Sequence, residues 1–174
     1  MTFSKPQYEF LSTAAEFAVY GGAAGSGKTH ALTIDPLRHC QGPSANPKFR
    51  GAVFRRTSPE LYQPGGLVDH CKGLYGPLNA SFNHTHNVFR FPCGAELSLQ
   101  YLASDKDMPK FLGAQFDWIG IDEAALFTEA QVFFLQGRAR SVSGVKPVMR
   151  LTCNPDFSSW LFKFLAWWID PSTG

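Results

Sequence analysis

A run of small residues near the amino terminus ends in a lysine and a threonine, a pattern that can bind phosphate. The run comprises Gly22, Ala23, Ala24, Gly25, Ser26, Gly27, Lys28 and Thr29. Its glycines let the backbone curl, so that successive N–H groups point at one anionic centre. Lys28 would reach the β- and γ-phosphates of a nucleotide, and the Thr29 hydroxyl would ligate Mg²⁺. The spacing therefore predicts a nucleotide-binding loop, and the alternative is a glycine-rich turn without a nucleotide.

The residues on either side of this loop have the order that the motif requires. Residues 16–20 form a short apolar run typical of a buried strand, and residues 29–40 are compatible with a helix. Such a helix would direct its positive dipole end at the phosphates. Strand, loop and helix in this order favour a phosphate-binding loop over a simple turn.

Two adjacent acids, Asp122 and Glu123, end an apolar run that begins at Phe116. A buried parallel strand would place both carboxylates at its carboxyl end, beside the phosphate loop. Asp122 would hold Mg²⁺, and Glu123 would orient and deprotonate the attacking water. The alternative is that the pair caps the next helix, because acids favour the positive end of a helix dipole. Together with the phosphate loop, the pair favours hydrolysis over phosphoryl transfer to a second substrate.

A polar residue, followed by a proline, also ends a further segment that reads as a buried strand, residues 148–153. This residue, Asn154, could hydrogen-bond the γ-phosphate or the attacking water and so report whether ATP or ADP is bound. An Asn-Pro pair also makes a simple turn. Without the other motifs, that turn is the preferred interpretation.

Together these segments resemble the ATPase domain of the large terminases of tailed bacteriophages, the motors that pump DNA into procapsids. The resemblance covers nearly the whole chain and rests on the phosphate loop, the acidic pair and four further segments. Those segments are Lys5-Pro6-Gln7, Phe54-Arg55-Arg56-Thr57, Gly113-Ala114-Gln115-Phe116-Asp117 and Leu151-Thr152-Cys153-Asn154-Pro155.

The resemblance implies an α/β fold of the P-loop NTPase kind, in the class with an additional strand and a catalytic glutamate. It implies that Gln7 recognises the adenine edge of ATP and that Asn154 belongs to the motif coupling hydrolysis to movement. Such motors form homo-oligomeric rings, usually pentameric, on a portal protein. They act with a small terminase subunit on double-stranded DNA in the host cell cytoplasm.

A neighbouring subunit in such a ring supplies a basic finger to each active site. In some relatives an arginine directly precedes the glycine corresponding to Gly113, but this chain has Leu112 there and Lys110 two residues earlier. The other candidates are Arg138 and Arg140. An arginine is preferred, because its planar, permanently charged guanidinium matches phosphate oxygens. Each basic residue could instead lie on a solvated helix face or contact DNA.

The resemblance assigns residues 1–168 to one motor domain and residues 169–174 to the start of a linker. The family's second half is a nuclease domain, which this sequence does not include, so DNA cleavage is not expected. The length of 174 residues and the hydrophobic content of 44% fit one α/β unit. A net charge of +2 neither requires nor excludes contacts with DNA.

Alternating strand-like and helix-like segments predict a mainly parallel sheet with helices on both faces. Residues 81–102 alternate polar and apolar side chains around a turn, which predicts antiparallel strands at one edge. His84 and His86 fall in this region, where an exposed strand face is favoured over a metal site. Helices are expected over residues 60–75 with an interruption at 64–66, over 128–137 and over 158–168.

Other observations limit the classes of protein. The four cysteines are scattered without a C-x-x-C pair, which argues against a zinc site and a disulfide framework. No signal peptide or membrane-spanning run is recognisable. A helicase-like ATPase would share the phosphate loop and acidic pair, but such helicases carry a second motor domain. A slow nucleotide-gated switch is disfavoured by Glu123, because a positioned general base speeds turnover.

Overall fold

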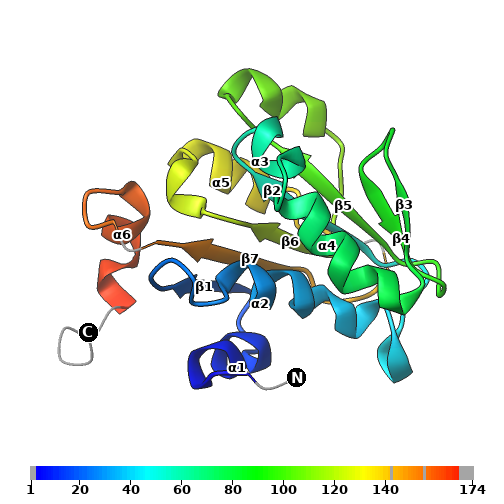
Figure 1. Cartoon of the computed structure of the whole chain (residues 1–174). Coiled ribbons are helices and arrows are strands. Elements are labelled where there is room, and N and C mark those ends of the chain that lie inside the picture. The colour runs from blue at the N-terminus through cyan, green and yellow to red at the C-terminus, as the bar shows by residue number, and fades with distance from the viewer. Residues whose placement is uncertain (1–2, 142, 155, 169–174) are drawn as a thin grey trace.

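The structure is a computed structural model that describes residues 3–141, 143–154 and 156–168. Within these residues the chain forms a seven-stranded sheet in the order β1-β7-β6-β2-β5-β4-β3 (Figure 1). The parallel strands are β1 (Phe17–Gly21), β7 (Val148–Cys153), β6 (Trp118–Ile121), β2 (Arg50–Arg55) and β5 (Glu96–Tyr101). The antiparallel strands at one edge are β4 (Val88–Arg90) and β3 (Ser81–Asn83). The predicted mainly parallel sheet with an antiparallel edge is thus confirmed.

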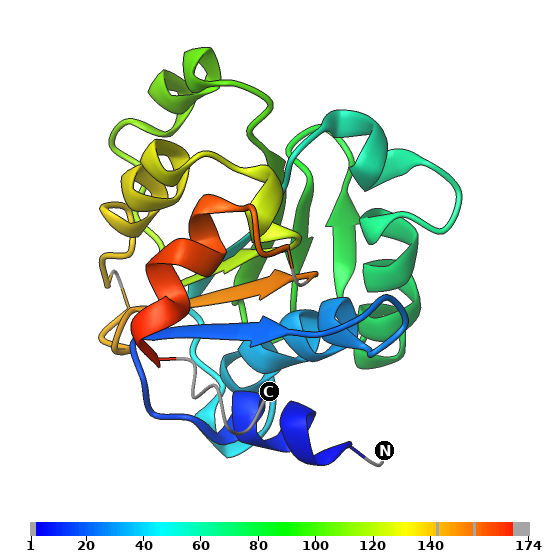
Figure 2. The ribbon, with the colours of Figure 1, turned by 90° about the vertical axis from the view of Figure 1, so that its left-hand side faces the viewer.

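Helices cover both faces of this sheet. One face packs against α1 (Lys5–Ser12), α2 (Lys28–Ile34) and α4 (Leu67–Tyr75). The other packs against α5 (Glu129–Gln136) and α6 (Trp160–Leu165). Figure 2 shows this division, with α1 below β1 and α6 above it. The helix α3 (Ser58–Tyr62) follows β2, and 3-10 turns occupy Asp35–His39, Gly42–Ser44, Gly76–Leu78, Asp105–Phe111, Ala124–Leu126 and Ala166–Trp168.

Local sequence explains where several of these helices begin. At α5 the Thr128 hydroxyl accepts from the Gln131 N–H at 3.2 Å, and the Gln131 side chain accepts from the Thr128 N–H at 3.1 Å. This reciprocal pair satisfies two backbone donors that the first helical turn leaves free. The same pattern begins α1 at Ser4 and α3 at Thr57. The described residues contain no helix with the length and apolar character of a membrane span.

The packing of α2 on the sheet depends on a glycine in β6. A Cβ atom on Gly120 would lie 2.3 Å from the Trp118 ring and 3.3 Å from Leu32 of α2. Only glycine leaves room for the Trp118 ring here, because a Cβ atom would overlap it, and the Leu32 side chain of α2 would also have to shift. Gly120 thus lets Trp118 and Leu32 pack closely between β6 and α2.

Some local expectations need correction. The α-helix expected to reach residue 40 ends at Ile34 and continues as a 3-10 turn, because Pro36 has no N–H for a helical bond. His84 and His86 lie in the turn between β3 and β4, not on a strand. The Asn83 side chain accepts there from the His86 N–H at 3.1 Å. Pro155 and residues 169–174, the expected start of a linker, lie outside the described residues.

Candidate active site

The loop between β1 and α2 is curled by two glycines in the left-handed region. Gly25 has a φ of 79° and Gly27 a φ of 76°, a conformation that costs other residues energy. The first residue of the loop is tied to the end of β7, because the Gly22 N–H donates to the Cys153 carbonyl at 3.2 Å. The conformation is that of a loop whose backbone can surround an anion.

The Lys28 side chain folds over this loop. Its Nζ donates to the carbonyls of Gly22 at 2.6 Å and Ala23 at 2.7 Å, and lies 3.3 Å from the Ser26 hydroxyl. Only 8% of the lysine is exposed. Its ammonium group is therefore held at the loop by neutral carbonyl oxygens, which bind a cation more weakly than phosphate does.

The register of the parallel strands brings three further polar residues together. Phe54 of β2 pairs with Ile121 of β6, and Ile121 pairs with Leu151 of β7. The residues that follow these three along their strands are Arg55, Asp122 and Thr152. Because side chains alternate along a strand, all three point to the face that α2 covers.

Asp122 is the centre of this group and is 1% exposed. Its Oδ1 accepts a hydrogen bond from the Thr152 hydroxyl. Its Oδ2 accepts from the Thr29 hydroxyl at 2.8 Å and lies 2.5 Å from Nη2 of Arg55. The phosphate loop and the acidic pair, 93 residues apart in sequence, thus touch each other. The Thr29 hydroxyl and the Asp122 carboxylate are oxygen ligands of the kind that Mg²⁺ prefers, so the residues fit this ion.

Glu123 adopts a backbone conformation that is unusual for its type. Its φ of 56° lies in the left-handed region, which is sparsely populated by residues other than glycine. Its N–H donates to the Thr152 hydroxyl at 3.2 Å, and its carbonyl accepts from Leu126 at 3.0 Å. Its half-exposed carboxylate has no hydrogen-bond or ion-pair partner within the described part of the chain and does not cap the 3-10 turn that follows. It is therefore free to accept a hydrogen bond from a water molecule.

Gln7 and Asn154 reach the same region from opposite ends of the chain. Nε2 of Gln7 donates to the Gly27 carbonyl at 3.4 Å, while its Oε1 accepts from the Ser4 N–H at 2.9 Å. The contact places α1 against the end of the phosphate loop. Asn154 is exposed and follows β7 directly, at the end of the sheet where the loop begins.

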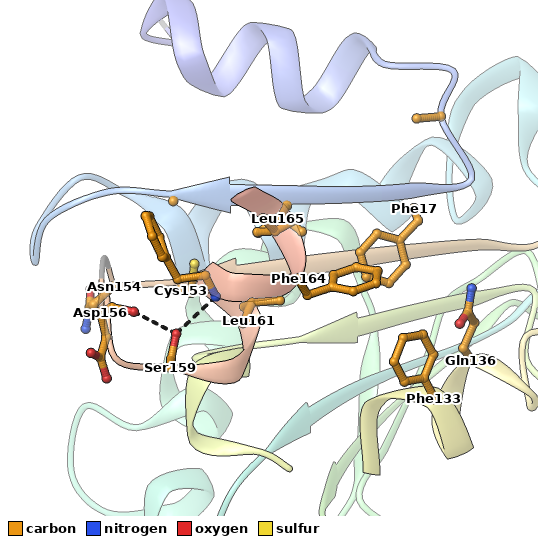
Figure 3. Close-up of a pocket in the computed structure, with 14 residues that line it drawn as sticks. Phe17, Phe133, Gln136, Cys153, Asn154, Asp156, Ser159, Leu161, Phe164 and Leu165 are labelled. Atoms are coloured by element: carbon orange, nitrogen blue, oxygen red, sulfur yellow. Dashed lines mark hydrogen bonds between the residues drawn. The ribbon is translucent and has the colours of Figure 1, made fainter. Parts of the chain in front are cut away.

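A separate pocket of about 770 Å³ lies next to this end of the sheet, between β1, α5 and α6. Figure 3 shows the rings of Phe17, Phe133 and Phe164 facing its interior and Asn154 at its side. Ser159 lies at the start of α6, where its hydroxyl accepts from the Phe162 N–H at 3.2 Å. The mainly apolar lining has no cation for a phosphate, so this pocket is not the expected nucleotide site.

The basic residues considered as fingers are not at the phosphate loop. Arg138 lies with its guanidinium 5.4 Å from the centre of the Phe134 ring. The Arg140 N–H donates to the carbonyl of Phe116, which precedes β6, so both arginines lie at the amino end of that strand. Lys110 is exposed and pairs with Asp107 at 2.5 Å. Arg138 and Arg140 thus lie at the end of β6 opposite to Asp122.

Sequence reasoning attached no individual role to Arg55 and Thr152. Both are polar residues near the carboxyl ends of buried strands, as Asp122 is. That shared position was the available signal. Its meaning depends on the order of the strands, which places β2 and β7 on either side of β6.

A histidine of α4 lies behind this site. Nε2 of His70 is 3.1 Å from the Thr33 hydroxyl, and its ring packs edge-on against His30 of α2. Burial lowers the pKa of His70, and the neighbouring His30 lowers it further. These surroundings favour the neutral form of the His70 ring.

Comparison with known proteins gives a family and a fold. Residues 19–173 match the model of a family described as terminase large subunit, T4likevirus-type, N-terminal. No curated protein sequence matches the chain.

Three solved structures resemble the chain at low identity, so they bear on the fold alone. The large terminase of a thermophilic bacteriophage has 19% identity and a TM-score of 0.70, over 95% of this chain and 44% of that one. The HK97 bacteriophage large terminase has 14% identity and a TM-score of 0.71, over 95% of this chain and 36% of that one. A chain of the bacteriophage Phi-29 viral genome packaging motor assembly has 16% identity and a TM-score of 0.62, over 94% of this chain and 51% of that one. This chain spans less than half the length of either large terminase.

Proposed function

We propose that this chain, which belongs to the T4likevirus-type family of terminase large-subunit N-terminal domains, is the ATP-hydrolysing motor domain of a viral DNA-packaging terminase. The observation that carries the proposal is the contact between Thr29 and Asp122, with the unpartnered carboxylate of Glu123 beside it. This contact supports the proposal, because it brings the loop, the two oxygen ligands that would hold the metal and the residue assigned as the general base to one end of the sheet. The large terminase of the thermophilic bacteriophage was also solved with ADP and with ATP-gamma-S, which supports an adenine nucleotide as the ligand.

The chain's own residues divide the work of hydrolysis. The backbone N–H groups of the loop (Gly22, Ala23, Ala24, Gly25, Ser26 and Gly27) and the Lys28 ammonium bind the β- and γ-phosphates. Thr29 and Asp122 hold Mg²⁺, which when bound neutralises the charge on the phosphate oxygens. Glu123 orients the attacking water and accepts its proton. Binding phosphate requires Lys28 to exchange its two carbonyl partners for phosphate oxygens.

Two residues at the rim of the site add recognition and coupling. Gln7 lies against the end of the phosphate loop through Gly27, so its amide is the group we assign to the adenine edge. Asn154 follows the strand that anchors Gly22, so a contact between its amide and the γ-phosphate would be transmitted to β7. Movement of β7 and of the segment that follows it is how hydrolysis would be coupled to translocation.

The motor works as a homo-oligomeric ring in which one subunit completes the site of the next. Arg138 and Arg140 lie at the end of β6 opposite to the phosphate loop, so either would act on a neighbour's nucleotide and not on its own. Arg140 is the more exposed of the two, while Lys110, paired with Asp107, is the third candidate. The resemblance to the Phi-29 packaging motor assembly supports this arrangement. Its partners would be double-stranded DNA, a portal protein and a small terminase subunit in the host cell cytoplasm.

The test is the rate of ATP hydrolysis per subunit as a function of protein concentration, with Glu123→Gln as the blank. We expect the rate to rise with concentration, because sites are completed by neighbours. Mixing the Glu123→Gln protein with Arg140→Ala should restore part of the activity, because the first supplies the finger and the second the base. A constant, appreciable rate at all concentrations would refute the ring, and hydrolysis by Glu123→Gln would refute the assignment of the base.

A further inference from the structure

Arg55 makes the most unusual contact of the candidate site. Its Nη2 lies 2.5 Å from Oδ2 of Asp122, and the two side chains are 17% and 1% exposed. Its Nε is buried and has no hydrogen-bond partner among the described residues. A guanidinium group has five N–H donors, so a buried one with an unused Nε lacks an anion on that side.

This ion pair uses the carboxylate that the metal needs. Oδ2 of Asp122 is shared by Arg55 and Thr29, and Oδ1 is taken by Thr152. A divalent cation held by Thr29 and Asp122 would meet the guanidinium at the same oxygen, where two cations repel each other. Arg55 and Mg²⁺ therefore compete for Asp122.

We propose that Arg55 neutralises Asp122 in the nucleotide-free protein and moves to the γ-phosphate when Mg²⁺ and ATP bind. The inference rests on the proposed function and adds a residue to it. The move is short, because Asp122 touches Thr29, the last residue of the phosphate loop. Phosphate oxygens offer the planar guanidinium the anion that its buried Nε lacks. ADP has no γ-phosphate, so Mg²⁺ with ADP displaces Arg55 from Asp122 without giving it a new partner.

The neighbouring arginine provides a matched control. Arg56 points elsewhere, since its Nη1 donates to the Leu102 carbonyl at 2.8 Å and to Oε1 of Gln131 at 3.2 Å. It therefore links the end of β5 to α5 and takes no part in the competition for Asp122. Arg55→Gln and Arg56→Gln remove the same charge one residue apart.

The experiment measures binding of fluorescent ADP and of ATPγS at a series of Mg²⁺ concentrations, with circular dichroism as a check on folding. For Arg55→Gln we expect the Mg²⁺ concentration at half-maximal ADP binding to fall about tenfold, the factor for losing one charged hydrogen bond. We expect the preference for ATPγS over ADP to fall about tenfold as well. Arg55→Lys keeps the charge without the planar group, so it should retain the wild-type Mg²⁺ requirement and lose the preference. Arg56→Gln should match the wild type in both quantities.

Two results would overturn the role of Arg55 and leave the proposed function standing. In one, Arg55→Gln weakens ADP and ATPγS equally with no change in Mg²⁺ requirement, which would make Arg55 a structural support. In the other, Arg55→Gln binds both nucleotides as the wild type does. If the wild type itself binds neither nucleotide with Mg²⁺, the proposed function fails and the role of Arg55 fails with it.

Discussion

Replacing Thr152 with valine would test whether one buried hydroxyl holds both acids of the site. The Thr152 hydroxyl donates to Asp122 and accepts the Glu123 N–H at 3.2 Å, and the side chain is fully buried. Valine has the same branched shape and the same preference for strands, so the change removes these two hydrogen bonds and little else. A bond to a charged group contributes about 1.5–3 kcal/mol and a neutral one about 1 kcal/mol. We expect the free energy of unfolding to fall by about 2–4 kcal/mol.

The same change should affect turnover more than binding. The left-handed conformation of Glu123 costs about 1–2 kcal/mol, and its N–H bond to Thr152 helps to hold it. Without that bond the turn relaxes and the Glu123 carboxylate leaves its position beside Asp122. A displacement of this kind lowers kcat by about a hundredfold. Affinity for ADP, which depends on Lys28 and the loop backbone, should fall less.

Urea unfolding followed by circular dichroism and steady-state ATP hydrolysis measure the two effects. Thr152→Ser is the control, because it keeps the hydroxyl and loses only a methyl group. It should retain most of the turnover that Thr152→Val loses. The reasoning fails if Thr152→Val unfolds within about 0.5 kcal/mol of the wild type, the range of neutral substitutions. It also fails if serine and valine lower kcat equally.

Three further substitutions test other contacts. Lys28→Ala should weaken binding of ADP and ATP about a hundredfold in calorimetry, because the phosphates lose a charged partner, and unchanged affinity would refute the loop assignment. Gln7→Ala should reduce the preference for ATP over GTP in competition binding, and equal selectivity in both proteins would remove Gln7 from base recognition. Burial lowers the pKa of His70 from 6.5 in the folded protein, so the unfolded chain binds more protons just below pH 6.5. The free energy of unfolding should therefore fall as pH drops below 6.5. His70→Asn should make the free energy of unfolding less dependent on pH in this range. If it depends on pH identically in both proteins, His70 is not the cause.

Local sequence was sufficient for much of the fold. The phosphate loop, the start of α5 and the turn-rich antiparallel edge depend on residues a few positions apart, whereas α1 was not predicted and α3 begins two residues before the expected position. Glycine at Gly25 and Gly27 allows the left-handed backbone wherever the loop lies, and a capping pair such as Thr128 and Gln131 needs only one helical turn. The boundaries were less accurate where a local breaker acted, as at Pro36.

The acidic pair illustrates the limit of such reasoning. Its position after an apolar run predicted two carboxylates at the end of a strand, and both lie there. Their different surroundings depend on strands that are distant in sequence. Arg55 and Thr152 enclose Asp122, and Thr152 supports Glu123, only because β2 and β7 flank β6.

The sequence by itself thus determined that a phosphate loop and an Asp-Glu pair are present, because glycine torsions and apolar runs are local properties. Only the tertiary structure decided that Thr29 touches Asp122 and that Arg55 takes the carboxylate oxygen which Mg²⁺ would use. It also decided that Arg138 and Arg140 lie at the opposite end of β6 from Asp122. The physical reason is that strand order and register set which distant side chains meet, and both are fixed by burial of the whole sheet between its two helical layers.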